Sequence, residues 1–224
     1  MTRELTLGEL DRDGALEDAL GNLHGTSRAG FLRGAAVGGA ALLGLGSAPA
    51  AAADENRDVA ILNYALTLEY IQDSFYGEVE RIGALTGALA EQARVVAAHE
   101  RAHVKALRGV LGAKAVKRAK FDFKGATENA GRFRRTAVAF EDLAVAAYKG
   151  QAPLIRNRGL LVSALAIHTV EARHAAWIRR LAGVEPAAGA FDEPRSRAST
   201  LKVVAATDFT VQTESRRRRP RFTG

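Results

Sequence analysis

One combination of side chains occurs twice in the sequence and constrains the fold more than any other feature. Glu100 and His103 are three residues apart, and so are Glu171 and His174. On a helix, this spacing puts a carboxylate and an imidazole on the same face about one turn apart, where they can bind one cation together. A single Glu-x-x-His pair is usually part of a solvated helix face, so the repetition is what makes the pair informative.

Each pair is preceded by another acidic residue at nearly the same distance. Glu69 lies 31 residues before Glu100, and Glu141 lies 30 residues before Glu171. Each half of the chain therefore contains a helix with a matching glutamate, a turn, and a helix with Glu-x-x-His. This is an internal repeat of a helical hairpin, which is a strong indication of architecture.

The segments around these positions are rich in Ala and Leu and are bounded by Gly or Pro, as is typical of helices. We expect four helices, over residues 58–82, 88–112, 129–150 and 152–183. Asp58 is expected at the start of the first helix and Pro153 in the first turn of the fourth. Runs of alternating β-branched residues are nearly absent, which argues against a sheet.

The lengths of the connections predict how the helices pack. Short turns within each hairpin make its helices antiparallel, and the longer linker over residues 113–125 leaves room for a crossover between the hairpins. With 224 residues and 47% hydrophobic composition, the chain can bury a full core. The sequence therefore predicts an all-α fold, a four-helix bundle made of two helical hairpins joined by a longer crossover.

The glutamates of the repeat lie among apolar neighbours, as in LTLEYI around Glu69 and VAFEDL around Glu141. A buried carboxylate must be paired, protonated or metal-bound, because burying a free charge is costly. Two divalent cations would cancel four carboxylate charges, and two neutral imidazoles would complete the ligand set. The chain has no cysteine, so oxygen and nitrogen must hold any metal. The alternative is a set of salt bridges, for instance with Arg101 or Arg173.

Residues 58–183 resemble the bacterial ferritin-like domain proteins, some of which are described as desiccation-related. The resembling stretches are DVAILNYALTLEY, AHERAHV, FEDLAVAAY and VEARHAAWIRRL, with a weaker extension in AFDEPRS at residues 190–196. The resemblance implies a ferritin-like four-helix bundle with a carboxylate-bridged di-metal centre, usually di-iron. It implies six metal ligands, all present here, namely Glu69, Glu100, His103, Glu141, Glu171 and His174.

The resemblance and the ligand types lead to two functional hypotheses. The leading one is an exported protein that binds two iron ions, or manganese, at these six residues and oxidises Fe(II) or consumes O₂ or peroxide in stress protection. In that case the six ligands are also the catalytic residues. The alternative is a non-catalytic envelope or desiccation-stress protein whose bundle binds metal or none. The family does not define the reaction, and zinc remains open as the metal.

Three further residues are candidates for contact with the metal ligands. Tyr76 and Tyr148 each follow a candidate glutamate by seven residues, and His168 precedes another by three. The alternative for the tyrosines is a core aromatic ring with a hydrogen-bonded hydroxyl, and for His168 a core histidine. His99 directly precedes a candidate glutamate and is expected to point elsewhere.

Residues 1–53 are similar to an export leader. Arg28 and Arg33 precede an apolar run rich in Gly and Ala, and small residues in an A-x-A arrangement follow. The arginine segment is similar to a twin-arginine signal, except that Ala29 stands where the second arginine belongs. We expect cleavage near Ala53 and a periplasmic, envelope or extracellular location, or a cytoplasmic one if the leader is not used. The alternative is an uncleaved flexible leader.

The sequence divides into a leader (1–53), a bundle (54–195) and a C-terminal extension with a basic tail (196–224). The formal net charge is +7, and much of the excess lies in Arg216–Arg219 and Arg221. Aromatic residues are not interleaved with these arginines, so we do not expect nucleic-acid binding, and a DNA-protecting role would rest on this tail alone. We expect metal ions and O₂ or peroxide as partners, no transmembrane span in the mature chain, and a monomer or homodimer.

Overall fold

The computed structural model of the chain describes residues 48–211. Most of the predicted leader and the arginine tail lie outside the described residues. Within them the secondary structure is helical, apart from one antiparallel bridge between Phe121 and Thr210. The long helices are α4 (Ala48–Ile82), α5 (Gly87–Leu111), α6 (Ala130–Gln151) and α7 (Arg158–Leu181), and the shorter elements are α8 (Arg197–Ala206) and the 3₁₀ turns η1 (Gly112–Lys114) and η2 (Ala152–Leu154). The predicted all-α fold is confirmed.

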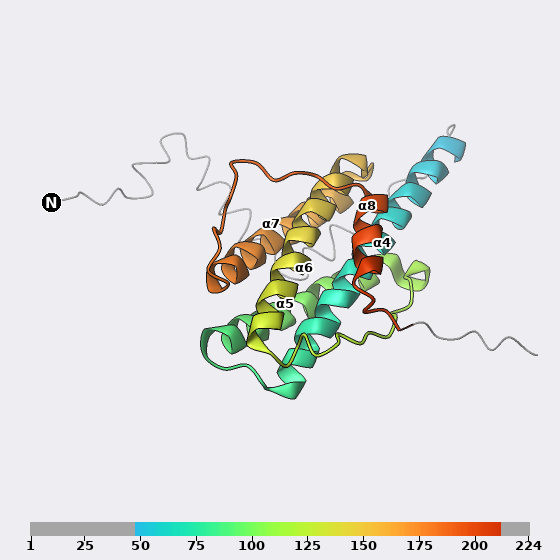
Figure 1. Ribbon diagram of the computed structural model, residues 1–224. Coiled ribbons are helices and arrows are strands. Elements are labelled where there is room, and N and C mark those ends of the chain that lie inside the picture. Colours follow the sequence, from blue (N-terminus) through green and yellow to red (C-terminus); the bar gives the residue numbers. More distant parts are fainter. Residues whose placement is uncertain (1–47, 212–224) are drawn as a thin grey trace, which may run out of the picture. The chain divides into compact units, whose positions relative to one another are not determined.

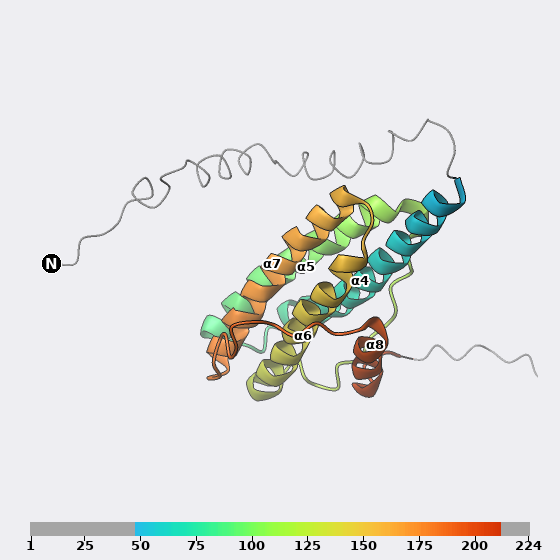
Figure 2. The same ribbon diagram turned by 90° about the horizontal axis from the view of Figure 1, so that it is seen from above.

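The four long helices form two hairpins that pack into a bundle. α4 pairs with α5 and α6 pairs with α7, while α4 also contacts α6 and α5 contacts α7 across the bundle. Figures 1 and 2 show the two hairpins lying side by side along most of their length. The predicted four-helix bundle is therefore the observed architecture.

The crossover between the hairpins, residues 115–129, runs along α4. At one end the side-chain oxygen of Asn63 accepts a hydrogen bond from the backbone N–H of Val116 at 2.7 Å. At the other end the Thr127 hydroxyl donates to Glu78 at 2.7 Å. Because Asn63 and Glu78 are four turns apart, the crossover carries the chain from one end of the bundle to the other. α6 therefore begins beside the end of α4 and runs antiparallel to it.

Two large apolar clusters fill most of the interior, and a polar layer separates them. Along α4 one cluster ends at Tyr70 and the other begins at Ile71. On α5 the gap between the clusters lies between Ala97 and Val104. The corresponding gaps on α6 and α7 contain the remaining candidate ligands. The buried acids of the sequence therefore occupy one cross-section of the bundle, with apolar packing on both sides.

Capping side chains set the starts of α6 and α7. The Asn129 side chain accepts a hydrogen bond from the backbone of Arg132, and the Asn157 side chain accepts one from the backbone of Leu160. The prediction that the fourth helix begins near Pro153 was wrong, because Pro153 lies in the separate turn η2 and α7 starts only after the Asn157 cap.

The prediction for Asp58 was also wrong. α4 begins at Ala48, so Asp58 lies inside the helix rather than at its start. The residue is 4% exposed, and its carboxylate accepts hydrogen bonds from the backbone N–H groups of Arg156 at 2.9 Å and Asn157 at 2.8 Å. Asp58 therefore joins the first hairpin to the turn that precedes α7.

Replacing Asp58 should measurably destabilise the fold. Asp58→Asn keeps one acceptor oxygen but places an amide N–H₂ opposite the second backbone donor, so one charge-assisted bond is lost at a cost of about 2 kcal/mol. Urea unfolding followed by circular dichroism measures this loss. Glu55→Gln on the same helix is the control, because Glu55 is exposed and its ion pair with Lys114 lies on the surface. Equal stability of the two variants would contradict the assigned role of Asp58.

The chain beyond the bundle packs back onto α6. The backbone N–H of Arg195 donates to the carbonyl of Ala146 at 2.9 Å. A Cβ atom at Gly150 would lie 2.1 Å from the Arg195 carbonyl oxygen, so the close passage of this segment requires glycine. α8 then packs against α6 (Figure 1), and Phe209 contacts the ring of Phe123. The division of the chain near residue 195 stays a prediction.

Between residues 48 and 211, none of the helices has both the length and the apolar composition that crossing a membrane requires.

Candidate metal centre

The polar layer contains all six side chains that the sequence singled out. They come from four helices, Glu69 from α4, Glu100 and His103 from α5, Glu141 from α6, and Glu171 and His174 from α7. None is more than 9% exposed, and Glu100, Glu141 and Glu171 are fully buried. Helical spacing puts each Glu-x-x-His pair on one face, and the hairpin geometry turns those faces toward each other.

The first group of donors surrounds the imidazole of His103. Its Nδ1 atom lies 3.0 Å from Glu171 Oε1, 3.3 Å from Glu69 Oε2 and 3.6 Å from Glu100 Oε2. One donor atom from each of these four residues can be chosen so that all lie within 4.8 Å of one another. A single cation at the centre of this group would be within reach of all four.

The second group surrounds the imidazole of His174. Its Nδ1 atom lies 3.2 Å from Glu100 Oε1, 3.6 Å from Glu141 Oε2 and 3.8 Å from Glu171 Oε2. These four residues also offer donor atoms within 4.8 Å of one another. Glu100 and Glu171 thus belong to both groups and direct different oxygens into each, which is the arrangement of two bridging carboxylates.

Hydrogen bonds within the cluster leave several of its donor atoms without a partner, whereas a pair of cations could bind them. Both oxygens of Glu100, one oxygen each of Glu141 and Glu171, and Nδ1 of His174 are buried without a hydrogen-bond partner. Buried polar atoms are rarely left unsatisfied in native proteins, so this cluster calls for a ligand. Oxygen and imidazole nitrogen are ligands for iron, manganese and zinc.

The salt-bridge alternative is not supported. Arg101 pairs with Glu80 at 2.6 Å on the surface, and Arg173 is exposed. Among residues 48–211, no lysine or arginine forms an ion pair with any of the six side chains. Within the described part of the chain, protons and metal ions are therefore the remaining sources of positive charge for the four carboxylates.

Without metal, protons balance the charge of the layer. Burial raises the pKa of Glu100 well above its usual range, and the charges of Glu171 and Glu69 raise it further. Burial also raises the pKa of Glu141, to about 7. Burial alone would lower the pKa of His174, but the nearby carboxylates of Glu100, Glu141 and Glu171 favour its protonated form and raise the pKa to about 12. The pKa of His103 is raised in the same way, chiefly by the charge of Glu69 against the effect of burial.

The raised pKa of Glu141 predicts how the metal-free protein responds to pH. A carboxyl whose pKa is higher in the folded state contributes stability that is fully present below its unfolded value of 4.5 and is lost as pH rises through about 7. We therefore expect the metal-free protein to lose stability between pH 4.5 and 7. Urea unfolding in the presence of a chelator measures it, and Glu141→Gln should flatten part of the decline. An identical pH profile in both proteins would contradict this prediction.

The two tyrosines contact Glu69 and Glu141, the glutamates that are not shared between the two groups. The Tyr76 hydroxyl donates to Glu141 Oε1 and the Tyr148 hydroxyl donates to Glu69 Oε1, both at 2.5 Å. Each bond joins α4 to α6, so each tyrosine serves the glutamate of the other hairpin. Burial, and then the adjacent carboxylate charge, raises the pKa of both tyrosines well above the usual value, which keeps the hydroxyls protonated as donors.

Contrary to the sequence prediction, His99 is hydrogen-bonded to one of the six side chains and His168 is not, among the residues that the structure describes. His168 is half-buried and forms no hydrogen bond with the six side chains within the described part of the chain. The expectation that His99 points elsewhere was wrong, because its Nδ1 atom lies 2.8 Å from Nε2 of His174. The planes of the two rings are nearly parallel, 14° apart, and with centroids 5.1 Å apart the rings meet edge to edge through these two nitrogen atoms. His99 reaches His174 because α5 and α7 pack against each other, and the spacing of residues in the sequence does not predict the distance between two helices.

A further contact was missed. The Gln72 amide donates to Glu171 Oε2 at 3.2 Å and is 3% exposed. The available signal was its position three residues after Glu69, which puts it on the same face of α4.

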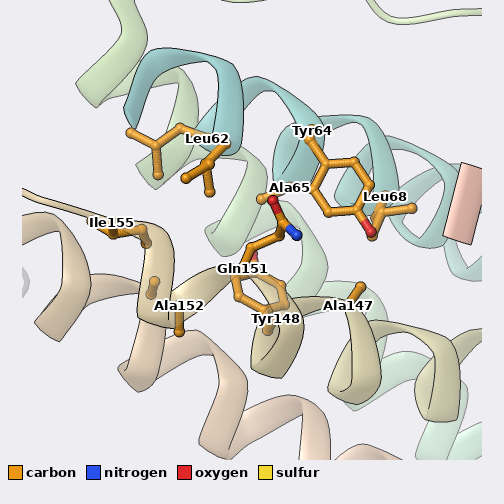
Figure 3. Close-up of a pocket in the computed structure, with 11 residues that line it drawn as sticks. Leu62, Tyr64, Ala65, Leu68, Ala147, Tyr148, Gln151, Ala152 and Ile155 are labelled. Atoms are coloured by element: carbon orange, nitrogen blue, oxygen red, sulfur yellow. The ribbon is translucent and has the colours of Figure 1, made fainter. Parts of the chain in front are cut away.

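A small cavity lies beside the layer, between α4 and α6. Figure 3 shows Leu62, Ala65 and Leu68 of α4 facing Tyr148 and Gln151 of α6 across it. Its volume is about 10 Å³, which is room for one water molecule at most. The cavity is therefore a gap in the packing and not a substrate site.

A helical bundle with two carboxylate–histidine groups that share two glutamates defines a ferritin-like protein with a candidate metal centre. The ferritin-like domain family matches residues 57–184, more than half of the chain, and the chain belongs to this family. No curated protein matches the chain.

Proposed function

We propose that this chain is an exported di-metal protein that binds two iron ions and oxidises Fe(II) or consumes O₂ or peroxide in stress protection. The observation that supports it best is the sharing of Glu100 and Glu171 between two histidine-containing groups, each with separate oxygens. A pair of redox-active metal ions held by such residues supplies one electron per ion to an oxidant.

The six side chains would each have a defined part. Glu69 and Glu141 each use Oε1 to accept a tyrosine hydroxyl and direct Oε2 toward a histidine, so each presents one oxygen to a metal position. Glu100 and Glu171 present both oxygens. Four carboxylates balance the charge of two divalent ions, and the apolar clusters above and below the layer exclude water from it.

The donor set also bears on the choice of metal. Magnesium and calcium prefer oxygen ligands alone, whereas two imidazoles in the layer favour iron or manganese. Zinc would bind the same donors but would not support redox chemistry. Metal analysis of protein purified from its native compartment tests the identity of the ions.

Stopped-flow absorbance tests the reaction. The Fe(II)-loaded chain is mixed with O₂ or with peroxide, and rapid oxidation of two Fe(II) per chain is expected. Glu100→Ala should lose this rapid phase because it removes a ligand from both groups. If a fully loaded wild-type sample shows no oxidation above that of free Fe(II), the redox proposal is wrong and the non-catalytic envelope or stress protein takes its place.

Export is part of the proposal and has a separate test. The side chains of Ala52 and Ala53 are exposed, and the buried part of α4 begins at Asp58. Cleavage near Ala53 would therefore shorten α4 without removing any of the described core residues. Mass spectrometry of the native protein should find an N-terminus close to Asp54, and a full-length chain in the cytoplasm would contradict export. The expectation of a monomer or homodimer stays a prediction, which light scattering can check.

A further inference from the structure

The contact between His99 and His174 gives one half of the layer a partner for which the other half has no counterpart among residues 48–211. His174 directs Nδ1 toward Glu100, Glu141 and Glu171, while its Nε2 lies 2.8 Å from Nδ1 of His99. His99 itself is exposed at the edge of the bundle. Its imidazole therefore lies between His174 and solvent.

The chemistry of a metal ligand determines the direction of this hydrogen bond. A neutral imidazole that binds a metal through Nδ1 must carry its proton on Nε2. In His174 that proton would point at His99, which then accepts it through an unprotonated Nδ1. Outer partners of this kind orient a ligating histidine and select its tautomer. The assignment of these protons follows from the heavy-atom geometry.

Within the two matching hairpins, only the first has a histidine at this position. His99 directly precedes Glu100, and the equivalent position before Glu171 is Val170, which has no side-chain acceptor. His103 makes its contacts with the carboxylates through Nδ1, and in the described part of the chain no hydrogen bond involves its Nε2. The two groups contain the same types of side chain, but they differ in whether the Nε2 atom of their histidine has a hydrogen-bond partner in the described part of the chain.

We propose that His99 is a positioning residue that holds His174 as an Nδ1 ligand, so that the metal position at His174 binds its ion more tightly than the position at His103. The proposal rests on the proposed di-metal site but not on any redox reaction. Its immediate consequence is that the two ions bind in sequence, with the His174 position filled first.

Calorimetric titration of the metal-free full chain with Co²⁺ at one fixed pH tests this order. The wild type should show two unequal sites. His99→Val copies the residue at the equivalent position of the repeat and should weaken the tighter site by about 10-fold or more. His99→Asn should retain most of the affinity, because its amide oxygen can accept the same hydrogen bond. Lys105→Val, an exposed position on α5, controls for valine in this helix.

Double variants identify which position is affected. In a Glu69→Gln background, which impairs the His103 position, His99→Val should still weaken binding. In a Glu141→Gln background, which impairs the His174 position, it should have little further effect. An unchanged affinity in His99→Val, or an equal loss in His99→Val and His99→Asn, would overturn the role of the hydrogen bond.

Two other outcomes are decisive. If the wild type takes up no Co²⁺, the proposed metal site is wrong, and this inference is wrong with it. If the wild type takes up two ions with equal affinity, only the inference about His99 is wrong. Nitrogen NMR of the metal-free protein gives a readout independent of metal: His99 should be found as the Nε2–H tautomer in the wild type, and a proton on Nδ1 would contradict the bond.

Discussion

Glu100→Gln is expected to weaken metal binding at both positions, whereas Glu141→Gln is expected to weaken it at one. Glu100 directs Oε1 toward His174 and Oε2 toward His103, so the substitution removes a charged ligand from both groups. Glu141 directs only Oε2 into the layer, because Oε1 accepts the Tyr76 hydroxyl. Glutamine has nearly the same shape, so the comparison isolates the loss of the carboxylate charge.

The expected size of the effect exceeds that of losing an outer partner. Removal of a hydrogen bond to a metal ligand lowers metal affinity by about 10- to 100-fold. Loss of a ligand itself should lower the affinity by more than about 100-fold at each position that the ligand contacts. After dialysis at low metal concentration, elemental analysis should find two ions per wild-type chain, one in Glu141→Gln and none in Glu100→Gln. Glu69→Gln is the matched control for the other group and should also retain one ion. Equal retention in Glu100→Gln and Glu141→Gln would show that Glu100 is not shared.

The convergence of the ligands was predictable because it depends on local periodicity. Three-residue spacing puts Glu and His on one helix face whatever the rest of the chain does. The matched separation of Glu69 from Glu100 and of Glu141 from Glu171 then sets two equivalent hairpins against each other. Apolar neighbours on both sides of each acid indicated burial, and the layer between two apolar clusters agrees with this.

The parts that the sequence did not predict depend on distances between helices. Tyr76 bonds to Glu141 rather than to the glutamate of its own helix, since α4 and α6 run antiparallel and bring these positions level. His99 was misjudged because neighbouring residues on a helix point about 100° apart, and that direction happens to face α7. The prediction that the first helix begins at Asp58 was wrong, because α4 includes ten residues before it. Local helix propensity does not show where tertiary packing of a helix begins.

The paired tyrosines explain how one layer can contain two kinds of carboxylate. A hydroxyl on Oε1 occupies half of Glu69 and of Glu141, and this leaves a single oxygen for a metal. Among residues 48–211, Glu100 has no such partner on either oxygen, and Glu171 accepts a hydrogen bond from the Gln72 amide on Oε2. In the proposed di-metal site, the difference between terminal and bridging glutamates would therefore be set by which side chains surround them, and not by their position in the Glu-x-x-His motif alone.

Metal binding is expected to raise the thermal stability of the chain by a large amount. The six donors meet only in the folded state, so an ion that binds them stabilises that state by an amount set by its concentration relative to its dissociation constant. At 1,000 times that constant each site contributes about 4 kcal/mol, and two sites contribute about 8 kcal/mol. For a domain of this size this corresponds to a rise in Tm on the order of 15–30 °C.

Calorimetric unfolding with Mn²⁺ or Fe²⁺ under anaerobic conditions, with and without a chelator, measures this rise in Tm. The rise should shrink as pH falls, because protons on Glu100, Glu141 and the imidazoles compete with the ions for the same atoms. A chain with Glu100→Gln and Glu171→Gln together should show almost no metal-dependent shift, since both shared carboxylates are gone. A wild-type Tm that is unaffected by saturating metal at neutral pH would mean that the buried acids of this bundle are balanced by protons alone. The di-metal proposal would then be wrong.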